Sequence, residues 1–252
     1  MKLFVFDCGA VGLPYRAVLD GEPGNISVPV PSFLIQHARG NVLFDTGLHR
    51  EMAVDSVGRL GPLSRFMTIE MTPEQHILPL LATVGMGPGD IDLVVNSHLH
   101  NDHCGGNEAF PDATIVLQRA EWEAAHDTAT AAKSGYDPRD FDHGQELRLL
   151  DGDTDLFGDG SVRLLSTPGH TPGHQSMLLE AGGRKLLLTA DACYLKRSMD
   201  EVKLPRILAD AAKTEASLRR LREMREAGLE TIYGHDPEQW AGLPKAPAAI
   251  WS

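Results

Sequence analysis

The apolar residues of this chain fall into short runs that are separated by turn-forming residues. Runs of this length, bounded by Gly, Pro, Asn or Asp, are typical of β-strands. They predict strands at residues 2–7, 32–37, 41–45, 91–96, 114–118, 161–166, 175–180, 185–189 and 230–233. The sequence Ala-Gly-Gly-Arg at 181–184 predicts a hairpin between two of these strands.

Other segments carry helix signals. Thr72 and Gln75 form a potential capping box, and the apolar residues after them predict a helix over residues 72–85. A short helix is expected at residues 119–126 and a long amphipathic one at residues 205–227. Because strands mostly precede helices, in two similar halves, we expect a layered α/β domain in which helices cover both faces of the sheet structure.

Two stretches lack clear periodicity. Residues 48–71 predict a long excursion from the sheet, and residues 127–145 predict a loop-rich segment suited to a lid. The chain shows neither an internal repeat nor a low-complexity tract. We therefore expect a single domain over residues 1–252, with these two stretches as insertions.

Charge narrows the range of partners. Lys and Arg number 23 against 35 Asp and Glu, which makes the formal net charge −12. A surface that binds phosphate groups needs the opposite balance. Neither nucleic acid nor a membrane is therefore expected as a partner.

Cysteine usage and the N-terminal segment suggest a cytoplasmic protein. Cys8, Cys104 and Cys193 are odd in number and widely spaced, which predicts reduced, buried thiols rather than disulfides or a thiolate zinc site. The first 14 residues predict a strand better than a signal peptide. No apolar stretch approaches the ~20 residues that a membrane helix needs.

Histidine is abundant, with 11 residues, and three of them stand in the sequence His-Leu-His-Asn-Asp-His at 98–103. This segment directly follows a predicted buried strand. Imidazole and carboxylate groups are the ligands that Zn²⁺ and similar divalent ions take. Alternation places the first two rings on one side of an extended chain, and Gly105 and Gly106 offer the conformational freedom to turn the rest back. The pattern predicts a metal site.

Three more ligand-type residues follow predicted strands further along the chain: His170, Asp191 and His235. A strand-end Asp alone is more often a turn residue. Together, seven such side chains at four strand exits are better explained by one metal site at a sheet edge. Asp191 is a candidate bridge between two ions, because a carboxylate has two oxygens.

Over nearly its whole length the chain resembles the metallo-β-lactamase superfamily, and within it most closely the N-acyl homoserine lactonases. The resemblance rests on the HxHxDH motif at 98–103 and on the segments STPGHTPGHQS, TADACY and GHD, which contain His170, Asp191 and His235. It implies an αβ/βα four-layer sandwich of two mixed β-sheets flanked by helices, with metal ions at the seam between the sheets.

The resemblance also implies a division of the ligands and a cofactor. It assigns His98, His100 and His170 to a first ion, and Asp102, His103 and His235 to a second, with Asp191 shared. His174 is left as a structural neighbour. Two Zn²⁺ are expected, although Mn, Fe or Co would suit the same ligands. One departure from the family is Asn101, where related lactonases often carry an aromatic residue.

The expected reaction is ring opening of a small lactone. Two cations lower the pKa of a bridging water and so provide a hydroxide nucleophile. We expect Tyr194 to donate to the developing oxyanion and Asp102 to carry a proton to the leaving alkoxide. Asp45 is a candidate for orienting a ligand histidine. Cys104 is expected to be a small buried residue.

Other functions remain open at this point. The chain could be another lactonase that resembles pyridoxolactonase, a thioesterase that resembles glyoxalase II, or a non-catalytic metal-binding protein. Only 17 residues follow His235, where a glyoxalase-like enzyme would be expected to have a basic helical region. No GxSxG or P-loop motif occurs. The protein is expected to be a monomer or a homodimer, and residues 48–71 are a candidate dimer contact.

Overall fold

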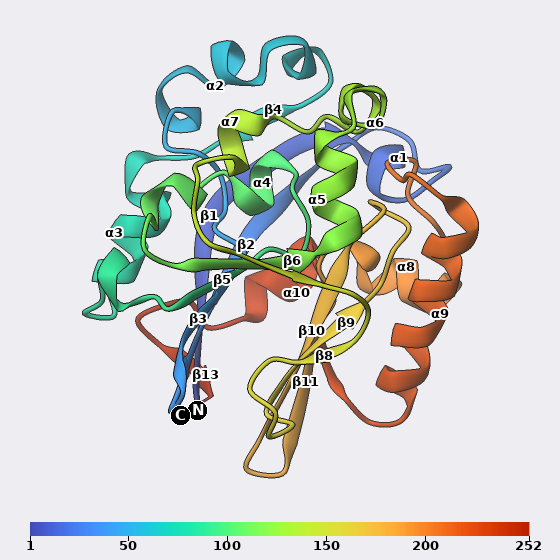
Figure 1. The fold of residues 1–252 in the computed structure, drawn as a ribbon. Helices are drawn as coiled ribbons and strands as arrows, with labels where there is room; N and C mark the ends of the chain where they lie inside the picture. The colour runs from blue at the N-terminus through green and yellow to red at the C-terminus, as the bar shows by residue number, and fades with distance from the viewer. Residues whose placement is uncertain (252) are drawn as a thin grey trace.

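Two mixed β-sheets lie face to face in the computed structural model, which describes residues 1–251 (Figure 1). The first sheet has the order β13-β1-β2-β3-β5-β6-β7, with β4 paired to β1, and the second has the order β12-β11-β10-β9-β8. The first contains β1 (Lys2–Pro14), β2 (Asn25–His37), β3 (Gly40–Phe44), β4 (Thr68–Glu70), β5 (Leu93–Val95), β6 (Thr114–Gln118), β7 (Leu147–Leu150) and β13 (Ala249–Trp251). The second contains β8 (Thr154–Asp155), β9 (Val162–Ser166), β10 (Gln175–Ala181), β11 (Arg184–Leu188) and β12 (Glu230–Ile232).

Helices cover the outer faces of both sheets. The helices of the described residues are α1 (Tyr15–Val18), α2 (Met52–Leu60), α3 (Ile77–Ala82), α4 (Asn101–Cys104), α5 (Arg119–His126), α6 (Thr128–Ser134), α7 (Pro138–Phe141), α8 (Lys196–Glu201), α9 (Ala211–Glu226) and α10 (Pro237–Gly242). α10 differs from the others, because its Trp240 packs against the core between the sheets. In Figure 1, α9 lies along the second sheet, on the side of the molecule opposite to α3. The predicted four-layer α/β sandwich is confirmed.

Alternation along the strands explains the layers. In β11, Leu186 and Leu188 are buried in the core between the two sheets, whereas Leu187 is buried against Leu218 and Leu221 of α9. Successive strand side chains point to opposite faces, so a strand that is apolar throughout fills two cores at once. The first sheet does the same, and a third core lies between it and the helices on its outer side.

The predicted strands are present, mostly with ends that shift by a few residues, but β1 and β2 are much longer than expected: β1 continues to Pro14 and β2 begins at Asn25. The bend in β1 explains part of this. The pairing of β1 with β2 changes register between Asp7 and Ala10, and Gly9 there has a φ of 98°. A bulge of this kind needs a residue that tolerates the left-handed region. The second half of β1 then carries Val11 and Leu13 to the functional site. β4, β7, β8 and β13, which are two to four residues long, were not predicted.

The two stretches without periodicity contain short helices. Residues 48–71 form α2, a 3₁₀ turn and β4, and residues 127–145 form α6 and α7. They are joined by a buried ion pair between Arg59 and Asp140. Helical periodicity did not reveal α2, α6 and α7, since helices of four to nine residues offer few positions for a pattern.

Two predicted helices differ in extent. The capping box of Thr72 and Gln75 forms, but it caps a single 3₁₀ turn, and the chain is extended at His76 before α3 begins. The long helix begins at Ala211 rather than at 205, because the side chain of Asp210 accepts from the backbone of Lys213 and caps it there. Within residues 1–251, the helices are too short or too polar to cross a membrane.

Leu179, which is fully buried between the sheets, tests the inter-sheet core. Replacing it by Ala is expected to lower the free energy of unfolding by about 2–5 kcal/mol, because a cavity remains where the side chain packed. Lys185→Ala on the neighbouring strand β11 is the control, since Lys185 is exposed, and should change stability by less than about 0.5 kcal/mol. Denaturant unfolding of the two variants measures the difference, and equal effects would contradict this packing.

Candidate metal centre

The seven predicted ligands come together where the strands of both sheets end. The segment His98–His103 follows β5 of the first sheet, while His170, Asp191 and His235 follow β9, β11 and β12 of the second. Their side chains form clusters of mutually close nitrogen and oxygen atoms. The candidate metal site therefore lies not at the edge of one sheet but where loops from both sheets meet.

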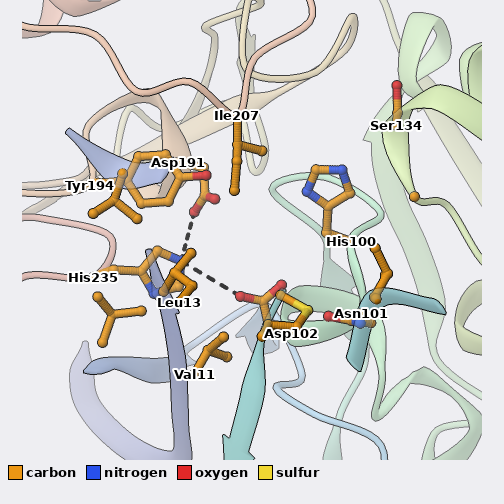
Figure 2. Close-up of a pocket in the computed structure, with 15 residues that line it drawn as sticks. Val11, Leu13, His100, Asn101, Asp102, Ser134, Asp191, Tyr194, Ile207 and His235 are labelled. Carbon is orange, nitrogen blue, oxygen red and sulfur yellow. Dashed lines mark ion pairs between the residues drawn. The ribbon is translucent and has the colours of Figure 1, made fainter. Parts of the chain in front are cut away.

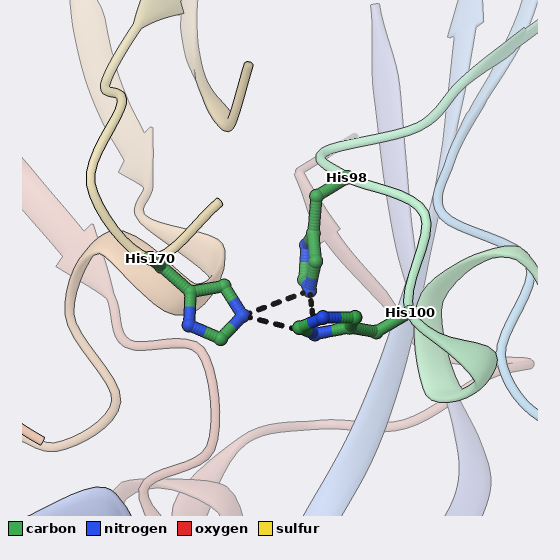
Figure 3. Close-up of side chains that lie close together, drawn as sticks. All are labelled: His98, His100 and His170. Carbon is green, nitrogen blue, oxygen red and sulfur yellow. Dashed lines mark hydrogen bonds between the residues drawn. The ribbon is translucent and has the colours of Figure 1, made fainter. Parts of the chain in front are cut away.

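Three imidazoles form the first cluster (Figure 3). His98 Nε2 lies 3.0 Å from His100 Nδ1. His170 Nε2 lies 3.1 Å from each of these two atoms. A tetrahedral ion with Zn–N bonds of 2.0–2.1 Å would separate its nitrogen ligands by about 3.3 Å. The triangle is therefore close to the size that one metal ion requires.

The second cluster contains Asp102, His103 and His235. Asp102 Oδ2 lies 3.6 Å from His103 Nε2 and 3.8 Å from His235 Nε2. Asp191 lies between the clusters. Its Oδ1 is 3.2 Å from His103 Nε2 and 3.0 Å from His235 Nε2, and its Oδ2 is 3.3 Å from His170 Nε2. One carboxylate thus presents an oxygen to each cluster, which is the arrangement of a shared ligand.

Hydrogen bonds on the far side of the rings assign where the imidazole protons lie. His170 Nδ1 is 3.0 Å from the carbonyl of Ile207, and His235 Nδ1 is 2.7 Å from the carbonyl of Pro29. His103 Nδ1 is 2.8 Å from Asp45 Oδ2. Carbonyl and carboxylate oxygens accept only, so in each ring Nδ1 donates and Nε2 directs a lone pair into the site.

The ring lone pairs and the carboxylate oxygens that face them repel each other unless positive charge lies between them. His235 Nε2 faces Asp191 Oδ1, and His103 Nε2 and Asp191 Oδ1 are both buried without a hydrogen-bond partner. Burial lowers the pKa of His235, but the neighbouring carboxylates of Asp191 and Asp102 outweigh it, so that the net shift is upward. The two carboxylates therefore favour positive charge at these rings, which either a proton or a metal ion can supply. The donor set and the unpartnered atoms fit divalent metal ions.

Asp45 holds the second cluster from behind, as the sequence suggested. It is buried and accepts from Ser97 N at 2.7 Å and Ser97 Oγ at 2.8 Å, in addition to His103. Burial raises the pKa of its carboxyl, and the contact with His103 opposes that rise. Its backbone φ of 61° lies in the left-handed region, which Asp and Asn tolerate better than most residues.

His174 lies outside both clusters and supports Asp191 through the backbone. Asp191 N–H donates to His174 Nε2 at 3.0 Å, so Nδ1 carries the proton and donates to Thr167 Oγ1 at 2.9 Å. Thr167 then donates to Ser176 Oγ at 3.0 Å, and Ser176 to the carbonyl of Thr189 at 2.8 Å. This chain of donors has one consistent direction, and it connects the β9 exit to the β11 exit.

The two glycines after the motif act differently from the prediction. The φ angles of Gly105 and Gly106 are −60° and −92°, which other residues adopt freely. A Cβ at Gly105 would lie 2.4 Å from the backbone nitrogen of His49, and one at Gly106 would lie 2.5 Å from the carbonyl of Thr46. Close approach of the backbone, rather than a special turn conformation, therefore requires glycine here.

The cysteines are free and buried, as expected. Cys104 Sγ donates to the carbonyl of His100 at 3.2 Å, and burial raises the pKa of the thiol well above its usual value. A thiol that stays protonated is a poor nucleophile and a poor metal ligand. Cys104 thus fills space beneath the motif.

An apolar pocket opens beside the two clusters and encloses about 650 Å³, including the space at its mouth (Figure 2). Asp102, Asp191, Tyr194 and His235 lie at its polar end, together with His100 and Asn101. Its apolar wall is formed by Val11, Leu13, Val18, Val28, Leu63, Met67 and Ile207. Sequence reasoning missed this wall, because it is assembled from segments that are far apart along the chain.

Tyr194 lies against the ligands. Its hydroxyl is 3.3 Å from His170 Nδ1, and its ring stacks on His235 with a centroid distance of 5.4 Å. Burial, followed by the nearby carboxylate of Asp191, raises the pKa of the phenol well above its usual value. The phenol therefore keeps its proton and can donate a hydrogen bond into the pocket.

The fold and the two clusters define a class of protein. Residues 27–235 match the metallo-beta-lactamase superfamily, and the chain belongs to that superfamily. It is 38% identical over 234 residues to the N-acyl homoserine lactonase AttM of Rhizobium radiobacter, covering 90% of this chain and 89% of that protein. It is 35% identical over 256 residues to an N-acyl homoserine lactonase of a Bacillus species, covering 99% and 98%.

Solved structures agree with these relatives. The chain superposes with a TM-score of 0.89, at 31% identity, on an N-acyl homoserine lactone hydrolase with the product N-hexanoyl-L-homoserine bound at its catalytic metal centre. The match covers 99% of this chain and 98% of that chain. A second quorum-quenching N-acyl homoserine lactone hydrolase gives a TM-score of 0.86 at 30% identity, covering 99% and 98%.

Asp45→Asn tests how the centre is supported. Asn keeps the left-handed backbone and the shape of the side chain, but it has one acceptor oxygen where Asp45 uses two. We expect affinity for divalent metal to fall about 10- to 100-fold, as found when a residue that orients a ligand is lost. Chelator competition on the folded protein measures it. The control is Asp92→Asn, in which the exposed carboxylate also accepts from a backbone nitrogen, that of Asn41. Equal affinities in the two variants would contradict the assignment.

Proposed function

We propose that this protein is a metal-dependent hydrolase that opens the lactone ring of N-acyl homoserine lactones. The observation that carries the proposal is the pair of clusters that share Asp191 at the polar end of an apolar pocket. The names of relatives that align with about nine-tenths of the chain or more support this choice of substrate. Water adds across the ester bond, and the product is an N-acyl homoserine.

The proposed cofactor is a pair of Zn²⁺ ions, with Mn, Fe or Co as alternatives for the same ligands. His98, His100 and His170 would hold one ion, Asp102, His103 and His235 the other, and Asp191 both. Bound there, the ions would supply an activated water and a Lewis acid for the carbonyl. The remaining chemistry depends on the side chains of this chain.

Asp102 is the proposed proton carrier. Its side chain is 17% exposed, in contrast to the nearly inaccessible histidines around it, and it lines the pocket. A carboxylate at this position accepts a proton from the attacking water and passes it to the alkoxide that leaves when the ring opens. The same side chain belongs to the second cluster, so a bound ion would hold its orientation during the transfer.

Tyr194 is the proposed donor to the oxyanion. Attack on the carbonyl places negative charge on its oxygen, and a donor already oriented toward that position stabilises the charge without reorganisation. The buried phenol keeps its proton and lines the pocket next to Asp191. Both properties suit the role.

The pocket supports an uncharged substrate with an apolar tail. Aliphatic side chains of β1 and β2, with Ile207 opposite, form the wall next to the ligands. Burying an alkyl chain there is favourable by about 0.8 kcal/mol per CH₂ group. The acidic balance of the protein disfavours polyanionic substrates.

A panel of substrates tests the proposal. Short- and long-chain N-acyl homoserine lactones, thioesters and phosphodiesters would be compared by pH-stat titration, together with metal analysis of the purified protein. We expect acid release from the homoserine lactones with about two ions per chain. Preferential turnover of thioesters would instead support the glyoxalase-like alternative, and metal binding without any turnover would support a non-catalytic protein.

Asp191→Asn is expected to reduce metal content and to abolish lactone turnover. The amide offers one neutral oxygen in place of the carboxylate whose two oxygens face the two clusters. Elemental analysis and the pH-stat assay measure the two effects. Asp200→Asn, on the surface of α8, is the control. Full activity with full metal occupancy in Asp191→Asn would exclude a shared ligand.

Tyr194→Phe is expected to lower kcat for lactones about 100- to 1,000-fold while metal content stays unchanged, because only a donor to the transition state is removed. The matched control is Tyr15→Phe at the start of α1, where the side chain is half-buried. Steady-state kinetics with one lactone provide the measurement. An unchanged kcat/KM would remove Tyr194 from the mechanism.

We further infer a monomer or a homodimer. Residues 48–71 expose Val54, Val57 and Phe66 at 85%, 65% and 69%, which supports this segment as the dimer contact. A cytoplasmic location remains a prediction from the sequence.

A further inference from the structure

One buried carboxylate, that of Glu121 on α5, contacts three different segments around the metal centre. The side chain is inaccessible to solvent. Its Oε1 accepts from Leu99 N at 3.0 Å and from the hydroxyl of Tyr136 at 2.8 Å. Its Oε2 accepts from Gly173 N at 2.9 Å. All three partners donate, so both oxygens act as acceptors.

The two backbone donors belong to the loops that carry the first cluster. Leu99 stands between His98 and His100, and Gly173 stands three residues after His170. These loops leave different sheets, yet His98 Nε2 and His170 Nε2 must lie 3.1 Å apart. The carboxylate of Glu121 therefore hydrogen-bonds to the backbone of both loops, to one loop through each oxygen.

The loop that carries Gly173 packs closely against α5 and has little room to move. A Cβ at Gly173 would lie 2.1 Å from the backbone nitrogen of Glu121, so the loop rests directly on the first turn of α5. α5 in turn packs on the first sheet through Ala125. Because the carboxylate is inaccessible, water cannot take over its hydrogen bonds, and a lost acceptor would leave a buried N–H unpaired.

We propose that Glu121 is a positioning residue of the metal centre, which sets the separation of the His98–His100 loop from the His170 loop and thereby the affinity of the first cluster for a divalent cation. The inference rests on the metal site of the proposed function, but not on the identity of the substrate. Glu121 itself does not touch the ions or the reacting atoms. Its hydrogen bonds act on the backbone beside the ligands.

Glu121→Gln tests this with little change of shape. The amide oxygen can still accept from Leu99 and Tyr136, but the amide nitrogen then meets Gly173 N, donor against donor. We expect affinity for one of two Co²⁺ or Zn²⁺ ions to fall about 10- to 100-fold, while the ion held by Asp102, His103 and His235 is retained. Chelator competition and the visible absorption spectrum of the Co²⁺-loaded protein report this without any activity assay.

Glu123→Gln is the matched control, because Glu123 is exposed on the same helix. It should bind both ions with unchanged affinity and give an unchanged Co²⁺ spectrum. Thermal unfolding of the metal-free proteins separates positioning from stability. A purely structural role would lower the apparent affinity for both ions in parallel with the unfolded fraction, and that outcome would overturn the proposal.

Tyr136→Phe decides the matter if Glu121→Gln does not fold. It removes one of the three donors and leaves both loops attached, so a smaller loss of affinity, about threefold to tenfold, is expected at the same ion. If whichever of Glu121→Gln and Tyr136→Phe folds binds the ion of the first cluster with unchanged affinity, the proposal is overturned. Wild-type protein that binds two ions but opens no lactone would refute the proposed function alone, and the effect of Glu121→Gln on cation affinity would still decide this inference.

Discussion

The site depends on the carboxylate of Asp191, which lies between the two clusters and contacts histidines of both. Its two oxygens face ring nitrogens from both clusters, and the far nitrogens of those rings are bonded to carbonyls or to Asp45. Such an arrangement is unfavourable in a buried place unless positive charge is present. The fold therefore favours positive charge at the seam of the sheets, and the donor set there fits divalent ions.

The seam itself follows from simple rules. Strands that are apolar on both faces must be covered on both faces, so the two sheets share one core and each recruits helices to the other side. The loops at the strand ends then lie at the edge of the inter-sheet core. They are free to carry polar residues while the strands that precede them hold their backbones in place.

Hydrogen bonds to the backbone of these loops, and to the ring nitrogens that face away from the site, fix the positions of the candidate ligands. Asp45 orients His103, His174 accepts from the backbone of Asp191, and Glu121 accepts from the two loops of the first cluster. Each supporting residue joins segments from different parts of the chain. A metal site assembled across two sheets needs such connections, because neither sheet alone sets the distance between the ligands.

Local patterns were sufficient for most of the strands, for the short helix α5 and for the choice of candidate ligands, since each depends on neighbouring residues. Alternating or continuous apolar runs marked the strands, and HxHxDH placed three imidazoles within six residues. The second half of β1 was hidden because Gly9 and Gly12 interrupt its apolar pattern, although the bulge lets the strand continue. The start of α9 was misplaced because the cap at Asp210 prevails over the apolar spacing before it.

The residues that line the pocket, and the hydrogen bonds that position the candidate ligands, could be found only in the tertiary structure. Glu121 looks like any helical glutamate in the sequence, and its partners Leu99, Tyr136 and Gly173 carry no pattern that connects them to it. The pocket wall likewise joins β1 and β2 to residues 63–67 and to Ile207. Residue types and short spacings specify which groups can bind a metal, whereas their distances depend on long-range packing, which no local pattern records.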